Sequence, residues 1–228
     1  TGSVITTGSG DDELEGRGGI DNIHAGAGDD WVYVTSLNYL GDTLDGGTQT
    51  TGDWLDAYGG GTVDMNLATI TGFENIWVDV ANFTANNDNF DIYLGNSGHA
   101  VTLGSGTQNV HSVDPWLNVN GAGNDTITLG SGANNVNTGA GSDTVNGTVQ
   151  AADVVDLDAG DDTFVYQTLA GDVRGGSGTD TLTVGAGMGG MGLDLDSAAG
   201  VGVYSGFENV SGASADSYMG ITAASTGS

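Results

Sequence analysis

Gly175-Gly-Ser-Gly-Thr-Asp-Thr-Leu-Thr183 is the nine-residue unit that decides the fold of this chain. A glycine-rich turn of six residues ends on an aspartate, and three residues with a central apolar side chain follow. The same pattern returns at three earlier turns, which end on Asp125, Asp143 and Asp162. The apolar position recurs at Ile92, Val101, Val110, Val119, Ile127, Val136, Val145, Val155, Phe164, Val173 and Leu182. Eight of these ten steps are nine residues long, and one step of eight is offset by one of ten, which is typical of a stacked array of repeats.

Such a unit predicts a solenoid. A three-residue strand with one inward apolar side chain is stable only when further turns of the same chain stack upon it. One unit holds one strand and one turn, so two units complete a coil and alternate units fall on the same edge. Rungs are then about 4.8 Å apart, and one edge carries an acidic column: Asp125, Asp143, Asp162 and Asp180. The opposite column reads His99, Leu117, Asn134, Ala152 and Gly171, so we expect only one acidic edge.

Carboxylates stacked at this spacing repel one another unless cations lie between the rungs. Carboxylates and turn carbonyls are hard oxygen ligands, which suit calcium better than zinc or copper. The unit Gly-Gly-x-Gly-x-Asp-x-apolar-x resembles the nonapeptide repeat of the RTX (repeats-in-toxin) family, which includes surface-layer and adhesin proteins. That resemblance implies an all-β fold, a right-handed parallel β-roll (β-solenoid). It also implies several Ca2+ ions, each held between neighbouring turns by aspartate side chains and glycine carbonyls.

A first, shorter array occupies residues 7–33, with Leu14, Ile23 and Val32 as its core positions. Alternate turns of this array share an edge, and a half-regular unit with two extra residues in its turn follows it. The resemblance assigns calcium ligands to the aspartate that ends each turn and, in the two arrays, to the glycine two residues before it. These residues are Asp12, Asp21, Asp30, Asp53, Asp125, Asp143, Asp162, Asp180, Gly10, Gly19, Gly28, Gly123, Gly141, Gly160 and Gly178.

A longer repeat divides the chain. Gly72-Phe-Glu-Asn-Ile76 recurs as Gly206-Phe-Glu-Asn-Val210, each after a glycine patch and an apolar segment. We predict two tandem modules, residues 1–83 and 84–228, each a calcium-binding array that finishes with a G-F-E-N segment; the second continues into a partial repeat. The aromatic residue of each segment is expected to cover an open end of a coil. Both termini read as mid-array sequence, so the chain is either a segment of a longer protein or a subunit that pairs end to end.

The charge is extreme, with 30 acidic residues against two arginines and no lysine, for a net charge of −28. This charge excludes nucleic acid and anionic membranes as electrostatic partners, and it requires counter-cations. Halophilic solvation is an alternative explanation of the acidity, whereas the regular apolar spacing argues against disorder. There are no cysteines, and no apolar run is long enough to insert into a membrane. RTX-like proteins typically leave the cell through a type I exporter, so the resemblance implies a secreted, extracellular or bacterial cell-surface location.

We expect no catalytic centre. His24, His99 and His111 lie in separate units without a zinc-protease motif, and the Asp-Asp pairs are better explained as neighbours in one calcium turn. The tryptophans fall at irregular intervals, which favours packing in the core or at coil ends over stacking on sugar rings: Trp31, Trp54, Trp77 and Trp116. A ladder of threonines beside the acidic column fits ordinary β-propensity better than ice binding: Thr126, Thr144, Thr163 and Thr181.

The function these patterns favour is that of a secreted, calcium-dependent structural protein, a subunit or segment of a surface layer, filament or adhesin. Its expected partners are calcium, further copies of itself joined end to end as a homo-oligomer or filament, and cell-surface polysaccharide. The alternative is the non-catalytic RTX secretion segment of a larger secreted enzyme or toxin. A sugar- or ice-binding adhesin module is the third hypothesis.

Overall fold

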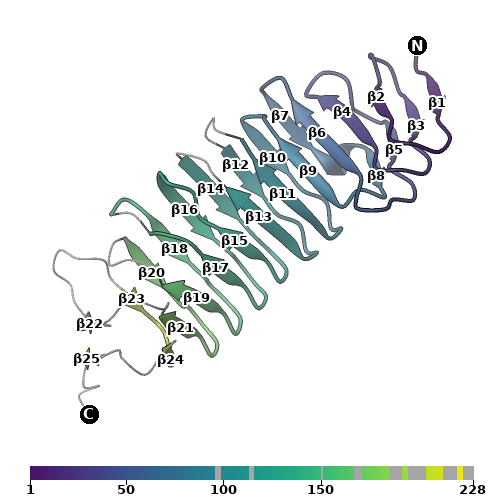
Figure 1. The fold of residues 1–228 in the computed structure, drawn as a ribbon. Coiled ribbons are helices and arrows are strands. Elements are labelled where there is room, and N and C mark those ends of the chain that lie inside the picture. Colours follow the sequence, from purple (N-terminus) through teal and green to yellow (C-terminus); the bar gives the residue numbers. More distant parts are fainter. Residues whose placement is uncertain are drawn as a thin grey trace.

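The computed structural model describes residues 1–95, 99–112, 116–149, 151–166, 171–184, 192–194, 204–212 and 220–222. Every strand pair in this part of the chain is parallel, and each strand pairs with strands two or three elements away, so the chain winds as a solenoid. Figure 1 shows the coils stacked in a single row from the N-terminal to the C-terminal end. The all-β solenoid predicted from the nine-residue unit is confirmed.

One long sheet, the front sheet, runs the length of the solenoid. Its strands, in spatial order, are β2 (Glu13–Glu15), β4 (Trp31–Thr35), β6 (Trp54–Tyr58), β9 (Asn75–Val78), β11 (Phe90–Leu94), β13 (Gln108–Ser112), β15 (Thr126–Thr128), β17 (Thr144–Asn146), β19 (Thr163–Tyr166), β21 (Thr181–Val184) and β24 (Asn209–Gly212). Because the front sheet is continuous, the residues at the start of its successive strands can be aligned along one edge of the solenoid. Each coil contributes one such residue, and we call this level of the solenoid a rung.

The opposite face consists of two back sheets. The first contains β1 (Val4–Thr6), β3 (Asn22–His24), β5 (Thr43–Asp45) and β8 (Thr69–Thr71). The second contains β7 (Thr62–Asp64), β10 (Asn82–Thr84), β12 (His99–Thr102), β14 (Trp116–Asn120), β16 (Ala133–Asn137), β18 (Val154–Asp156), β20 (Asp172–Arg174) and β23 (Tyr204–Ser205). β22 (Gly192–Asp194) and β25 (Gly220–Thr222) form a separate pair. The only helix in the described ranges is the 3-10 turn η1 (Met65–Leu67), and no helix there could cross a membrane.

The core is one column of apolar side chains between the faces. All eleven residues of the repeating apolar position from Ile92 to Leu182 are at most 1% exposed. The eight-residue and ten-residue steps of the apolar position correspond to a shorter and a longer coil. Val110 pairs with Ile127 across 17 residues, and Val145 pairs with Phe164 across 19. The predicted core positions are therefore confirmed, together with the loss and recovery of register.

The gap between the back sheets falls inside one enlarged coil, which contains β7, η1 and β8. The front sheet continues through this coil, and β10 spans residue 83. The division into modules 1–83 and 84–228 stays a prediction about the sequence repeat.

Phe73 of the first G-F-E-N segment is buried beside a cavity of about 260 Å³ that is also lined by Met65, Ile70 and Phe90. Since β11 stacks upon β9, Phe73 lies inside the solenoid, and the expectation that it covers an open end is wrong.

The tryptophan expectation is also wrong for three of the four residues. Trp31, Trp54 and Trp77 occupy outward positions of the front sheet, where they alternate with buried neighbours, and Trp77 is 38% exposed. The side chain of Trp116 lies outside the described part of the structure. The four-residue threonine ladder is present in register on the same face.

Candidate metal sites

One edge of the solenoid, here called the acidic edge, is formed by the residue before each front-sheet strand or, in β11 and β13, by the first residue of the strand. Its order along the axis is Asp12, Asp30, Asp53, Glu74, Phe90, Gln108, Asp125, Asp143, Asp162, Asp180 and Glu208. The aspartates are joined rung to rung, because the Asp125 N–H donates to Asp143 Oδ1 at 2.7 Å and the Asp143 N–H donates to Asp162 Oδ1 at 2.8 Å. The same bonds link Asp162 to Asp180, Asp12 to Asp30 and Asp30 to Asp53. The structure thus stacks these predicted site residues in two acidic ladders.

The second carboxylate oxygen has no hydrogen bond in seven of the buried aspartates. Oδ2 is buried without a hydrogen bond in Asp21, Asp30, Asp53, Asp125, Asp143, Asp162 and Asp180. It points into its own turn, since a Cβ added to Gly121 would lie 3.0 Å from Asp125 Oδ2 and one added to Gly175 would lie 2.8 Å from Asp180 Oδ2. A buried carboxylate oxygen is costly unless it is paired or coordinates a metal, so these oxygens fit a cation seated in the turn.

Backbone carbonyls complete the donor set. A Cβ added to Gly160 would lie 1.4 Å from the Gly141 carbonyl oxygen, and one added to Gly178 would lie 1.8 Å from that of Gly160. Both glycines have positive φ, 149° and 143°, so only glycine fits here for two independent reasons. Gly123 with Gly141, and Gly10 with Gly28, stack in the same way. Within the described ranges no three acidic or histidine side chains are close enough to hold a metal, so any ion here must use these carbonyls as well.

Burial also changes the acidity of the ladder. It raises the pKa of Asp125 to about 7 and that of Asp162 to about 6, against the stabilising hydrogen bond that each receives from the preceding rung. Burial likewise raises the pKa values of Asp143, Asp180 and Asp53. Without a cation Asp125 would therefore be partly protonated near neutral pH, and a bound cation would displace that proton.

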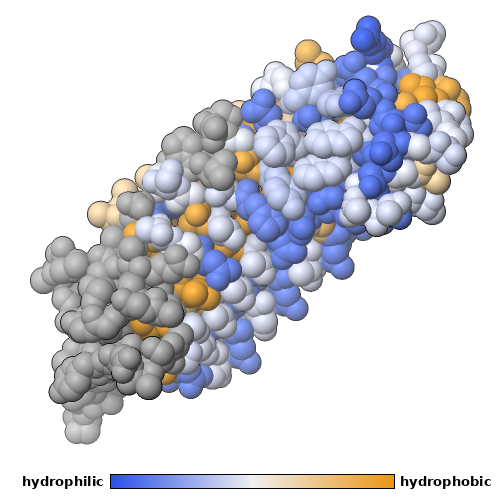
Figure 2. Space-filling model, viewed as in Figure 1, coloured by the Kyte–Doolittle hydropathy of each residue, from blue (hydrophilic) through white to orange (hydrophobic). Residues whose placement is uncertain are grey.

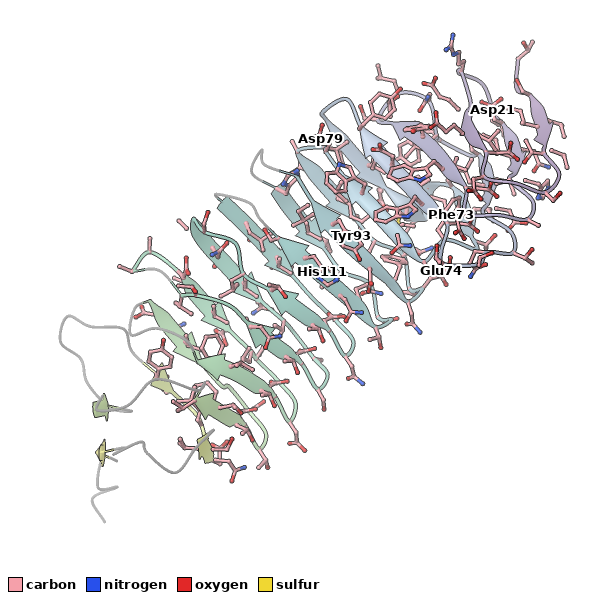
Figure 3. All side chains as sticks on the ribbon, viewed as in Figure 1. Asp21, Phe73, Glu74, Asp79, Tyr93 and His111 are labelled. Carbon is pink, nitrogen blue, oxygen red and sulfur yellow. The ribbon has the colours of Figure 1, made fainter. Side chains whose placement is uncertain are left out.

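Each ladder ends on the glutamate of a G-F-E-N segment. Glu74 Oε2 accepts the Asp53 N–H at 3.0 Å, and Glu208 Oε2 accepts the Asp180 N–H at 2.8 Å. The longer side chain makes the bond that an aspartate makes elsewhere, and in both places the next backbone N–H groups return to the carbonyl of the aspartate. Figure 3 shows Glu74 beside Phe73 at this edge. The recurrence of the motif was visible in the sequence, but the role of its glutamate was missed.

The opposite edge is acidic in places, which corrects the prediction of a single acidic edge. Asp21 and Gly19 lie on this edge, and the Asp21 N–H donates to Asp42 Oδ1 at 2.8 Å. In the second array Asn135 pairs with Val154, so Asp153, rather than the predicted Ala152, lies beside Asn134. The Asn134 N–H donates to Asp153 Oδ1 at 2.7 Å.

The residue before each ladder aspartate has a different role. Asp29 accepts hydrogen bonds from the Thr51 hydroxyl and from the backbone N–H groups of Thr50, Thr51 and Gly52, which hold the pKa of its carboxyl well below the usual range. The two extra residues of this turn therefore wrap around Asp29. Adjacent acids such as Asp29 and Asp30 are thus separated into a turn anchor and a buried ladder residue, which does not make a catalytic pair.

A family model of the RTX calcium-binding nonapeptide repeat (four copies) matches residues 6–36, 120–148 and 172–187. These ranges contain most of both ladders. The chain carries RTX-type calcium-binding repeats. Repeats of this type bind Ca2+ and form β-rolls, in agreement with the unpartnered oxygens of the ladders. No curated protein and no solved structure matches the chain.

Proposed function

We propose that this RTX-repeat chain is a secreted structural protein that becomes rigid when calcium is bound, as a subunit or segment of an extracellular surface layer, filament or adhesin. The observation that carries the proposal is the set of buried, unpartnered Oδ2 atoms along the ladders. They make the ion part of the folded structure rather than a ligand of a separate site, which is the expected use of calcium in an extracellular scaffold. Asp12, Asp30, Asp53, the Asp125–Asp180 ladder and the stacked glycine carbonyls would hold the ions, and Asp21 would do so on the opposite edge.

Two further features support an assembling scaffold. In the described structure the strands β1 and β2 each pair on one side only, so their other edges can pair with a further coil, from another copy or from the same longer chain. Val4 and Ile20, near that end, are 77% and 70% exposed. A head-to-tail contact between unlike ends that does not close into a ring must propagate. The high negative charge opposes such a contact until calcium has neutralised part of it.

Electron microscopy and light scattering of the chain in calcium and in chelator test the proposal. We expect filaments or sheets in millimolar calcium and none in chelator. Magnesium at the same ionic strength is the control, because its octahedral preference suits a wide carbonyl-lined turn poorly. A protein that binds calcium and folds but stays monomeric at high concentration would instead support the role of a segment within a larger secreted protein.

A further inference from the structure

The outward face of the front sheet between β4 and β13 carries a group of aromatic side chains that the calcium repeats do not explain. They are Trp31, Tyr33, Trp54, Tyr58, Trp77, Tyr93 and His111. Figure 2 shows large pale side chains gathered over this part of the face, and Figure 3 shows Tyr93 and His111 side by side on it. No other outward face in the described structure gathers rings in this way.

Four of these rings form a stack along the solenoid axis. Trp31 and Trp54 are nearly parallel, with centroids 4.9 Å apart and an interplanar angle of 6°. The stack continues from Trp54 to Tyr93 at 5.1 Å and from Tyr93 to His111 at 4.7 Å. Trp54 and Tyr93 are tilted by 37°, whereas the outer two pairs cover one another's faces, which leaves little flat ring surface on which a sugar could lie.

Beside the stack, aromatic side chains flank one carboxylate on the neighbouring strands. Strand register places Asp56 between Tyr33 on β4 and Trp77 on β9, and Tyr58 lies two residues along the same strand on the same face. Tyr33 and Tyr58 are perpendicular, with centroids 6.1 Å apart and an angle of 87°, and therefore form two walls of a corner. The Tyr58 hydroxyl donates to Glu15 Oε1 at 2.8 Å, which fixes the second wall. We call Tyr33, Tyr58, Trp77 and Asp56 the aromatic cage.

One oxygen of the cage carboxylate lacks a hydrogen bond. Asp56 Oδ1 is buried without a hydrogen bond. The chain has no lysine, and its two arginines pair with other acids, Arg17 with Glu15 at 3.4 Å and Arg174 with Asp156 at 3.7 Å. Burial, followed by the charge of nearby Asp79, raises the pKa of Asp56 to about 6. A cation from outside the chain would relieve both effects.

We propose that the aromatic cage binds the quaternary ammonium group of a small organic cation. Perpendicular aromatic walls around a carboxylate present ring faces and one negative charge to a weakly hydrated cation, which is the arrangement that favours cation–π binding. Calcium does not suit the cage, because it needs six to eight oxygen ligands. The cage lies on the sheet face, away from the acidic edge, so this proposal does not depend on the scaffold function.

Calorimetric titration of the chain with choline, in saturating calcium at a pH above the pKa of Asp56, tests the site. The matched neutral probe is 3,3-dimethylbutan-1-ol, which has the same shape as choline without the charge. We expect saturable choline binding, accompanied by a change in tryptophan fluorescence, and at least tenfold weaker binding of the alcohol. Asp56→Asn should weaken choline binding at least tenfold, whereas Asp91→Asn, an acid of the same face beside His111, should leave it unchanged.

Circular dichroism in calcium checks that both variants fold. Tyr58→Leu provides a second test, because it removes one wall of the cage while leaving Asp56 in place, and it should also weaken choline binding. Absence of choline binding to the unaltered chain would overturn the proposal, as would equal binding of choline and the alcohol. Tighter binding of methyl glucoside than of choline would also overturn it, in favour of a sugar site.

Discussion

The second acidic ladder and the middle of the solenoid use the same coil in different ways. In the ladder, β15 and β17 are three residues long and each buries a single apolar side chain, Ile127 or Val145. In the middle, β11 is five residues long and buries Phe90, Ile92 and Leu94. Each additional buried side chain of this size contributes about 1.5–3 kcal/mol. The β11 rung is therefore better supported by apolar burial than the β17 rung, whereas β13 buries one apolar side chain, Val110, between the polar Gln108 and Ser112.

The acidic edge differs in the opposite direction, because the ladder carries more buried charge there than the middle does. The ladder places a buried aspartate with an unpartnered oxygen at every rung, whereas the middle places Phe90 and Gln108 at the equivalent positions. The aromatic stack through Tyr93 and His111 adds contacts between middle rungs. We therefore propose that bound calcium would take the place of core in the ladder, and that the middle can stay folded without it.

The largest effect is expected from Phe83→Ala, which removes a ring that is 1% exposed in β10. The cavity should cost about 3–5 kcal/mol, and the loss should appear in chelator as well as in calcium, because the middle does not depend on the ion. Denaturant titration in chelator measures it. Val155→Ala, in the second ladder region, is the control and should have no effect in chelator, where its surroundings are already unfolded.

The next effect concerns the ladder itself. Asp143 lies between two rungs, whereas Asp125 faces Gln108 on one side, so Asp143→Asn should lower calcium stoichiometry or cooperativity more than Asp125→Asn does. Isothermal titration measures both, with at least tenfold weaker binding expected for Asp143→Asn, because each site loses a charged ligand. Asp91→Asn on the front face is the control. Asn134→Ala is a poorer control, since it removes the hydrogen bond from Asn134 Nδ2 to Asp153 Oδ1 on the opposite edge, although the backbone N–H of residue 134 still donates to Asp153. Equal effects of Asp143→Asn and Asp91→Asn would contradict the placement of the ions.

At low pH, protonation of the ladder aspartates should partly substitute for calcium in stabilising the fold. The pKa values of Asp125 and Asp162 are raised in the folded state, so protonation favours folding: the stability they contribute is present at low pH and is lost as the pH rises through about 6 to 7. In chelator, far-ultraviolet circular dichroism should show more β-structure at pH values near 4 than at 8. In calcium this dependence should disappear. Greater β-content at the higher pH in chelator would contradict the assignment.

The smallest expected effect is the gain of one calcium site. Gln108 is fully buried, its N–H donates to Asp125 Oδ1, and its own Oε1 has no partner. Gln108→Asp should extend the ladder by one rung, add one calcium ion and lower the stability of the chelated protein slightly. Titration calorimetry compares it with Gln108→Asn, which keeps the amide and should add no ion.

The solenoid, its core positions and the main ladder followed from the sequence, because a nine-residue period fixes both the strand face and the edge of each residue. Asp153 was missed because the ten-residue step lies between Val145 and Val155, and a spacing argument cannot say on which side of the turn the extra residue is placed. Asp42 was missed although Asp42-Thr-Leu44 repeats the pattern that follows the ladder aspartates.

The aromatic cage could not be predicted for a different reason. Tyr33, Asp56 and Trp77 are separated by 23 and 21 residues and come into contact only through the register of enlarged coils, in which the nine-residue period is absent. The role of the glutamates in the G-F-E-N segments could not be predicted for the same reason, because their positions are also set by the irregular coils. Where the period fails, tertiary pairing decides which side chains meet.

Hydrogen exchange measured by mass spectrometry, with and without calcium, tests the central claim most directly. In chelator near neutral pH we expect the amides of 123–146, 160–166 and 171–184 to lose their protection, while those of 75–94 keep most of theirs. Calcium should restore protection in the ladder and change the middle little. Equal loss of protection in both regions, or protection of the ladder in chelator, would contradict the claim that calcium replaces core only where the core is thin.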